Sequence, residues 1–321
     1  DYIYNLIVFI YMISFQQIQY ILAIEETRHF QKASDLCFVT QPTLSMQIKK
    51  AEETLGYLIF DRSSNPLSLT PFGEGLIPII RDLLVDYDKI NSYVKKSAGT
   101  YTERLRLAII PTISPFIVPD MFDEWHDLLP NVQLVMEEMK SEDILIALDK
   151  REIDLAILAG PLNDQSLRTV PLFKEEIKAY IPSLEEKEIS SESLQKLHPW
   201  LLSKGNCLRT QMIHFCELNT SKNDEWNYEG GNLELLLRIV DAKGGYTLVP
   251  EEYQRVLKLD DRSCKNIFSK GNNEVPAREV IAVSSKRTSK WDSIEKIIRS
   301  VQLFYGKDRD ESDFKVLDWK G

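Results

Sequence analysis

Two cysteines, Cys207 and Cys216, lie nine residues apart in a chain that has only four cysteines. The stretch between them is typical of a short helix, because Asn206 is a good N-cap and neither Gly nor Pro interrupts it. In a helix the two thiols lie half a revolution apart and about 13 Å along the axis. A disulfide needs Cα atoms about 4.4–6.8 Å apart. The pair therefore joins only if the segment refolds, which is what a redox switch requires.

The helix N-terminus and nearby Arg209 favour the reactive thiolate at Cys207. Other roles for the two cysteines stay open. One alternative is two unrelated cysteines, of which at least one is simply buried. A zinc site is conceivable from element count, but the spacings match no common zinc module, and the Cys-x-x-Cys of thioredoxin-like enzymes is absent. The zinc candidates are Cys207, His214, Cys216 and Cys264. We assign no redox role to Cys37 or to Cys264, which lies in a polar, surface-like segment.

Composition indicates a globular, multidomain protein. The 321 residues exceed one typical domain, and a net charge of −10 argues against a protein wholly devoted to nucleic acid, while allowing a DNA-binding part. No stretch reaches the length of a membrane-spanning helix, so we expect no membrane partner. Residues 1–12 are apolar without the basic start of a signal peptide, and we interpret them as an extension outside the fold. Few, scattered cysteines and this missing signal predict a cytoplasmic protein.

Residues 13–70 contain short helical patterns and a small hairpin around residues 63–66. Ser14 with Gln17 is a capping-box signature that opens the first helix. The third helix opens at Thr40 and has an apolar face made by Leu44, Ile48, Ala51 and Leu55. Its opposite face and the nearby basic residues are suited to base edges and phosphates in a helix-turn-helix. These candidate DNA-binding residues are Gln41, Pro42, Thr43, Ser45, Gln47, Lys49, Lys50 and Arg62. The block is nearly neutral, so a generic helical domain stays open as an alternative.

Two further blocks follow. Residues 71–98 predict one long helix whose apolar residues recur at heptad spacing, suited either to pairing with a second copy or to packing on its own domain. Those residues are Leu76, Ile80, Leu83, Tyr87, Ile90 and Val94. Residues 102–305 alternate strands and helices, which predicts a mostly parallel α/β sheet with ligand positions at the strand ends. The predicted strands are 105–110, 132–136, 155–158 and 177–181.

The run from Arg28 to Lys50, followed by Leu55-Gly, Phe60-Asp-Arg62 and Thr70-Pro-Phe-Gly73, closely resembles the N-terminal domain of LysR-type transcriptional regulators. The resemblance implies an N-terminal all-α winged helix-turn-helix with a linker helix, and a C-terminal α/β, two-lobed, periplasmic-binding-protein-like effector domain. It also implies a regulator rather than an enzyme, with no cofactor. The implied partners are promoter DNA, RNA polymerase and further copies of the chain in a dimer of dimers. Residues 306–321 are an extension of unknown role.

The segment around Cys207 and Cys216 resembles the redox loop of the peroxide-sensing OxyR subgroup. By position, the resemblance makes Cys207 the thiol that hydrogen peroxide oxidises and Cys216 the one that resolves it to a disulfide, which cellular thiol reductants would reverse. Thr112, Ser141 and Arg278 match the subgroup's peroxide pocket, with Ser141 standing where threonine is usual. The resemblance also makes Asn206 a peroxide-binding residue; it stands where the subgroup often has histidine, and its amide donates a hydrogen bond but carries no charge.

Two rival functions share this architecture. One is a LysR-type regulator that is controlled by a small organic effector between its two lobes, with the cysteines incidental. The other is a secreted solute-binding protein with the two-lobed fold, but the N-terminal block and the missing signal peptide count against it. Each of the three residues that match the peroxide pocket also has an ordinary structural alternative. These are a helix cap for Thr112, a helix start for Ser141 and a surface position for Arg278.

Overall fold

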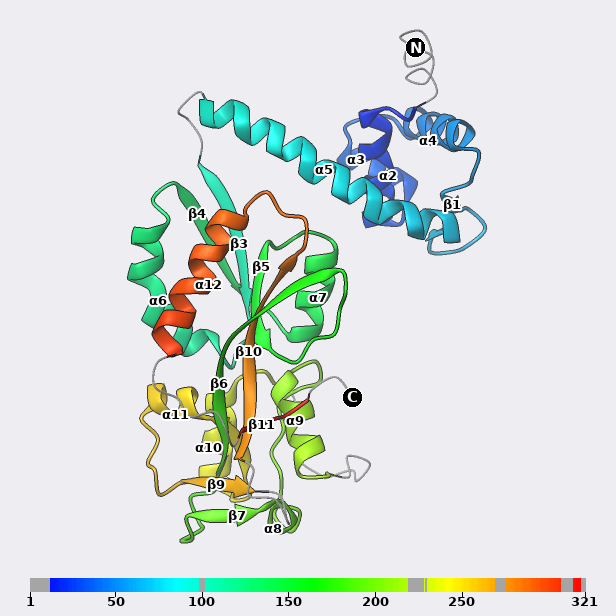
Figure 1. Cartoon of the computed structure of the whole chain (residues 1–321). Helices are drawn as coiled ribbons and strands as arrows, with labels where there is room; N and C mark the ends of the chain where they lie inside the picture. The colour runs from blue at the N-terminus through cyan, green and yellow to red at the C-terminus, as the bar shows by residue number, and fades with distance from the viewer. Residues whose placement is uncertain are drawn as a thin grey trace. The chain divides into compact units, whose positions relative to one another are not determined.

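The structure is a computed structural model that describes residues 12–97, 102–218, 228, 230–268, 275–306 and 314–318. Residues 1–11, on which part of the predicted N-terminal extension falls, lie outside it. The chain separates into two compact units, residues 1–94 and 95–321 (Figure 1). The predicted domain limits at residues 70, 98 and 305 stay predictions. No described helix is long and apolar enough to cross a membrane.

The described part of the N-terminal unit contains three helices and a hairpin, followed by most of the long helix α5 (Pro71–Ser97). The three helices and the hairpin strands are α2 (Phe15–Thr27), α3 (Phe30–Leu36), α4 (Gln41–Leu55), β1 (Phe60–Asp61) and β2 (Ser68–Leu69). The capping box predicted on Ser14 and Gln17 is confirmed. Helix α4 begins after Thr40, whose hydroxyl accepts from the Thr43 amide, and ends at Gly56 in the left-handed conformation that glycine favours. Because Leu44, Ile48 and Ala51 are buried, the opposite side of α4 is turned outward, as predicted.

Helix α5 (Pro71–Ser97) carries the predicted heptad stripe along its whole length. Ile80 is buried in the core of the N-terminal unit, and Leu76 packs against that core. Further along the stripe Leu83, Tyr87, Ile90 and Val94 are exposed. The first part of the stripe therefore belongs to its own domain, while the second part leaves an apolar row open for another helix.

The C-terminal unit is built on a mixed sheet whose described strands run in the order β4-β3-β5-β10-β6-β9-β7, with β8 added to β6 and β11 to β10. The first-lobe strands β3 (Glu103–Ile109), β4 (Val132–Glu138) and β5 (Leu155–Ala159) are parallel. The long strands β6 (Leu167–Tyr180) and β10 (Val275–Ser285) pair antiparallel with each other. The expectation of a mostly parallel sheet was wrong for this reason: the strands that link the lobes run in opposite directions.

Strands β6 and β10 pass from one lobe to the other, side by side (Figure 1). The first lobe adds α6 (Ser114–Leu128), α7 (Ser141–Asp149) and α12 (Trp291–Tyr305). The second lobe adds β7 (Glu188–Ser190), α8 (Ser191–Leu194), α9 (Cys207–Phe215), α10 (Leu233–Lys243), β8 (Thr247–Pro250), α11 (Glu251–Leu257), β9 (Cys264–Phe268) and β11 (Phe314–Val316). Each lobe has its own hydrophobic core. The predicted fold class, a helix-turn-helix part followed by a two-lobed α/β part, is confirmed.

The open row on α5 generates a first prediction. Ile90 is 62% exposed, so Ile90→Glu should leave the fold of the protomer intact. We expect the row to pair with a second copy, and a buried carboxylate in that seam should raise the dimer dissociation constant at least about tenfold. Analytical ultracentrifugation measures this constant. Asp88→Ala, an exposed change on the same helix, is the control; unchanged association of Ile90→Glu would contradict a dimer seam on α5.

Candidate functional site

Cys207 is the first residue of α9 and is buried in the core of the first lobe. The helix predicted between the two cysteines is confirmed, and Cys216 follows its last residue as the C-cap. Cys216 is buried in the other core, that of the second lobe. Both thiols are free. Helix α9 thus connects the two cores, with one cysteine anchored in each.

Arg278 and Glu175 form a fully buried ion pair where the two long strands join the lobes. They are direct cross-strand partners on β10 and β6, both are 0% exposed, and Nε of Arg278 donates to Oε1 of Glu175 at 2.8 Å. Nη1 and Nη2 of Arg278 donate to the hydroxyl and the carbonyl oxygen of Thr112, each at 2.8 Å. The other carboxylate oxygen of Glu175 accepts from the Glu252 amide at the start of α11. This network fixes the guanidinium in space.

Residues at the carboxyl ends of three parallel strands lie around Cys207, with Ser141 and Ala159 beside it and Thr112 joined to it through Arg278. Thr112 follows β3, Ser141 follows β4 as the first residue of α7, and Ala159 is the last residue of β5. The carboxyl ends of parallel strands are where such sheets bind ligands. The Ser141 hydroxyl is buried, has no nitrogen or oxygen partner in the described part of the chain, and faces the Cys207 thiol. The structure thus brings together four residues that the sequence predicted for one pocket: Cys207, Thr112, Ser141 and Arg278.

Burial raises the pKa of the Cys207 thiol above its ordinary value. The charge of Arg278, the Ser141 hydroxyl and the backbone amides of Leu208 and Ala159 act in the opposite direction without overcoming burial. The expectation for the helix terminus has the right direction, since the Leu208 amide favours the thiolate, but burial outweighs it. The expectation for Arg209 was wrong, because Arg209 donates to the Leu202 carbonyl at 2.7 Å and the nearby cation is Arg278.

Asn206 occupies the N-cap position, but its side chain does not cap α9. Its amide nitrogen donates to the carbonyl and the hydroxyl oxygen of Ser203, at 2.9 and 3.0 Å. Those two hydrogen bonds use both protons of the amide nitrogen. The predicted hydrogen bond from Asn206 to peroxide would require at least one of them to break.

Cys216 has a polar neighbour of its own. The Tyr246 hydroxyl is buried, has no nitrogen or oxygen partner among the described residues, and lies against the Cys216 thiol. Burial raises the pKa of Cys216 to about 11, with the Tyr246 hydroxyl acting the other way. Cys264, expected at the surface, is buried on β9, because that strand lies between β6 and β7 in the sheet. Within the described ranges no cluster of His, Cys, Asp or Glu is placed to hold a metal ion.

The predicted DNA-binding residues lie on or beside α4. Gln41, Pro42, Thr43, Lys49 and Lys50 are exposed and Ser45 is half-buried. The remaining two are partly engaged within the domain. The Gln47 side chain accepts from Gln17 at 3.2 Å, and Arg62 pairs with the buried Glu52 at 3.0 Å. Since Glu52 also accepts from the Ile59 amide, it holds the hairpin against α4.

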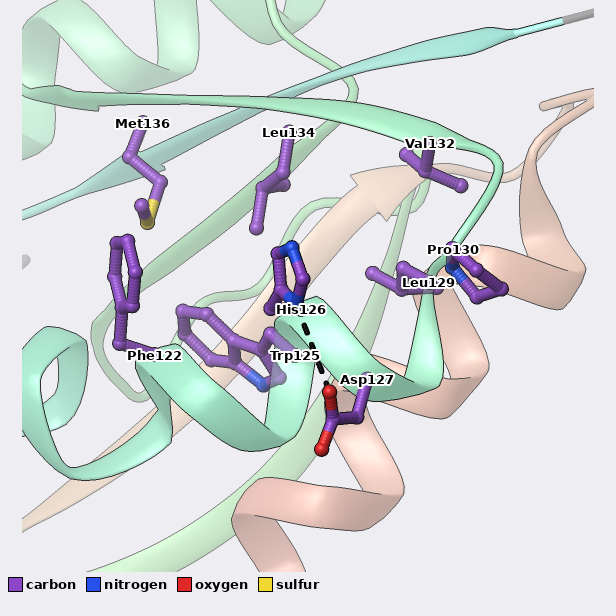
Figure 2. Close-up of a pocket in the computed structure, with 9 residues that line it drawn as sticks. All are labelled: Phe122, Trp125, His126, Asp127, Leu129, Pro130, Val132, Leu134 and Met136. Atoms are coloured by element: carbon purple, nitrogen blue, oxygen red, sulfur yellow. Dashed lines mark ion pairs between the residues drawn. The ribbon is translucent and has the colours of Figure 1, made fainter.

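A groove of about 390 Å³ lies on the first lobe, and it is not the cysteine site (Figure 2). Its walls are α6, the turn after it and β4, with Phe122 and Met136 at one end and Val132 and Pro130 at the other (Figure 2). All its lining residues belong to that one lobe, so it is not the site between lobes that the small-effector alternative requires.

Comparison with known families places both parts of the chain. Residues 15–74 match the bacterial regulatory helix-turn-helix family named after LysR, and residues 98–264 match the LysR substrate binding domain. The chain belongs to the LysR family. It is therefore a DNA-binding transcriptional regulator rather than an enzyme.

Relatives of this LysR-family regulator carry two kinds of name. The HTH-type transcriptional regulator EstR of Acinetobacter baylyi is 31% identical over 90% of this chain and 97% of its own. The hydrogen peroxide-inducible genes activator of Pectobacterium carotovorum is 30% identical over 73% of this chain and 79% of its own. Among solved structures, a full-length OxyR variant from Pseudomonas aeruginosa matches with a TM-score of 0.68 and 26% identity, covering 90% of this chain and 95% of that one.

Two residues of the site in this LysR-family regulator, Glu175 and Tyr246, were not predicted from the sequence. A signal for Glu175 existed, because Phe173, Glu175, Ile177 and Ala179 alternate on one face of β6 and are all buried. A charge in such a row needs a buried partner. Tyr246 gave no comparable signal, since an aromatic residue in a core strand is ordinary.

The contacts of Arg278 generate a prediction for the reactivity of Cys207. Arg278→Gln removes the charge that lowers the pKa of Cys207, so that pKa should rise further and alkylation by iodoacetamide should slow by about tenfold at a pH of about 7.5. The difference in alkylation rate between wild type and Arg278→Gln should shrink as the pH rises, since at high pH the Cys207 thiol is ionised in both proteins. Mass spectrometry of the Cys207 peptide gives the rate against pH.

Two companion variants make this experiment decisive. Arg278→Lys keeps the charge while losing the paired hydrogen bonds and should lie between wild type and Arg278→Gln. Arg209→Gln removes the cation adjacent in sequence and should alkylate at the wild-type rate. A larger effect at Arg209 than at Arg278 would contradict the electrostatic description of this pocket.

Proposed function

We propose that this LysR-family regulator acts in the cytoplasm as a hydrogen peroxide sensor, through oxidation of Cys207 and a disulfide from Cys207 to Cys216. The observation that carries the proposal is the placement of Cys207 beside Ser141, Thr112 and Arg278, with the second cysteine held in a different core. The likeness to proteins named hydrogen peroxide-inducible genes activators supports it.

Each pocket residue has a defined role in this proposal. The Thr112 oxygen accepts from Arg278, so its own hydroxyl proton remains available for a peroxide oxygen. Ser141 offers a hydroxyl without a nitrogen or oxygen partner among the described residues. Arg278 favours the thiolate of Cys207 and the negative charge that develops on the leaving oxygen. A small, polar oxidant suits a buried site that presents hydroxyl groups.

The chemistry balances in two steps. The Cys207 thiolate attacks one oxygen of hydrogen peroxide, the O–O bond breaks, and the departing hydroxide takes a proton to become water, leaving a sulfenic acid on Cys207. The Cys216 thiol then attacks the sulfenic sulfur, forming the S–S bond and releasing the sulfenic oxygen as a second water molecule. Two thiols are oxidised, one peroxide is reduced, and cellular thiol reductants reverse the change by disulfide exchange.

The second step has a structural consequence. Cys216 must leave the second core and cross about 13 Å of helix, so α9 cannot persist as it is. In the proposal, this refolding alters how effector domains associate in a dimer of dimers on promoter DNA, and thereby the contact with RNA polymerase. A covalent bond thus biases an element that has two arrangements.

Brief treatment with low-dose peroxide tests the proposal directly. Wild-type protein should gain one Cys207–Cys216 disulfide, detected by peptide mass spectrometry, and Cys207→Ser should gain none while still binding DNA. Cys264→Ser, a change to a buried cysteine outside the pocket, is the matched control and should form the bond normally. An intact wild-type protein without the bond would favour the alternative, a regulator with a small organic effector.

DNA binding by α4 has its own test. Lys49 is exposed and pairs only loosely with Glu53, at 3.7 Å, so its charge is available to a phosphate. Lys49→Ala should weaken binding across sequences and reduce the slope of log affinity against log salt by about 0.9. Lys89→Ala on α5 is the control. An unchanged slope for Lys49→Ala would remove Lys49 from the contact surface.

A further inference from the structure

Part of the C-terminal extension belongs to the second lobe. Residues Phe314–Val316 form β11, which pairs in parallel with Val275–Ala277 of β10, directly before Arg278 (Figure 1). The Leu317 amide donates to the Ala277 carbonyl at 2.8 Å. The Leu317 side chain is 7% exposed and lies in the core that also contains Cys216. This part of the extension is therefore packed beside the cysteine site.

This terminal segment holds the middle of α9. Gln211 lies between the two cysteines and is fully buried. Its amide nitrogen donates to the Leu317 carbonyl at 3.0 Å, and its amide oxygen has no partner in the described part of the chain. A buried amide that loses its hydrogen bond is strongly disfavoured. The bond to Leu317 therefore favours the helical position of Gln211.

Tyr246 acts on the far end of the same helix. Its hydroxyl lies against Cys216, inside the core to which Leu317 contributes. Leu208 and Met212 of α9 are buried in that core as well. The hydrogen bond from Gln211 to Leu317 and the contact between Tyr246 and Cys216 must both break before Cys216 can approach Cys207.

We propose that residues 314–317 are a latch on α9, and that its release limits the step in which Cys216 resolves the oxidised Cys207. This inference rests on the proposed function, since it concerns the second step of the same switch. The latch contacts Gln211, the second core and residues 275–277 of β10, while Arg278 keeps its own hydrogen bonds to Glu175 and Thr112. It therefore sets how long the sulfenic acid lasts before water leaves and the S–S bond forms, and not how fast peroxide oxidises Cys207.

The test uses the full chain with Leu317→Asp, which puts a charge where the latch is buried, and with Gln211→Ala, which removes the hydrogen bond from α9 itself. His214→Ala, an exposed change on the same helix, is the matched control. After addition of peroxide, samples are quenched with dimedone at successive times. Mass spectrometry then quantifies sulfenylated Cys207 and the Cys207–Cys216 disulfide separately.

We expect both latch variants to form the sulfenic acid at the wild-type rate and to convert it to the disulfide about tenfold faster, while His214→Ala behaves as wild type. Conversion at the wild-type rate or slower in both variants would overturn the latch while leaving the proposed function in place. Absence of any sulfenic acid or disulfide in the wild-type protein would instead overturn the proposed function, and the latch with it.

Discussion

The buried ion pair between Arg278 and Glu175 is the constraint on which the effector domain depends. Neither charge can reach water, so each must keep its partner, and removal of one from such a pair costs about 3–5 kcal/mol. The pair joins β6 to β10 at the junction of the lobes, ties Thr112 to the guanidinium and reaches the start of α11. The ion pair therefore ties Thr112 and Arg278, which lie at the Cys207 site, to the two strands that join the lobes.

In the proposed switch the two cysteines have different roles, because Cys207 lies beside Arg278 and Ser141 while Cys216 lies in the second core. Burial raises the pKa of both thiols, and a raised pKa lowers the fraction of the reactive thiolate. Arg278 and the Ser141 hydroxyl oppose that effect at Cys207, and the Tyr246 hydroxyl opposes it at Cys216. Cys216 is buried in the second core, so in the proposed switch its movement would disrupt the packing of that lobe.

The sequence was sufficient for features that are local. Short sequence patterns predict the α9 helix between the two cysteines and the strands that Thr112 and Ser141 follow. The partners of Arg278 do not, because they are 103 and 166 residues away in the chain, and the partner of Gln211 is 106 away. Arg209 was expected to favour the thiolate because it is two residues from Cys207 in the sequence, but its guanidinium donates to the Leu202 carbonyl. The cation near Cys207 is Arg278, which the fold brings there from a distant part of the chain.

Hydrogen exchange of residues 207–218, followed by mass spectrometry, tests the central claim most directly. Reduced protein and peroxide-treated protein are compared for wild type and for Cys216→Ser, with the disulfide verified in the same samples. We predict that amide deuterium uptake in this segment rises on oxidation of the wild type, because α9 must unwind, and stays low in Cys216→Ser. A verified disulfide with unchanged uptake would contradict a switch that works by refolding α9.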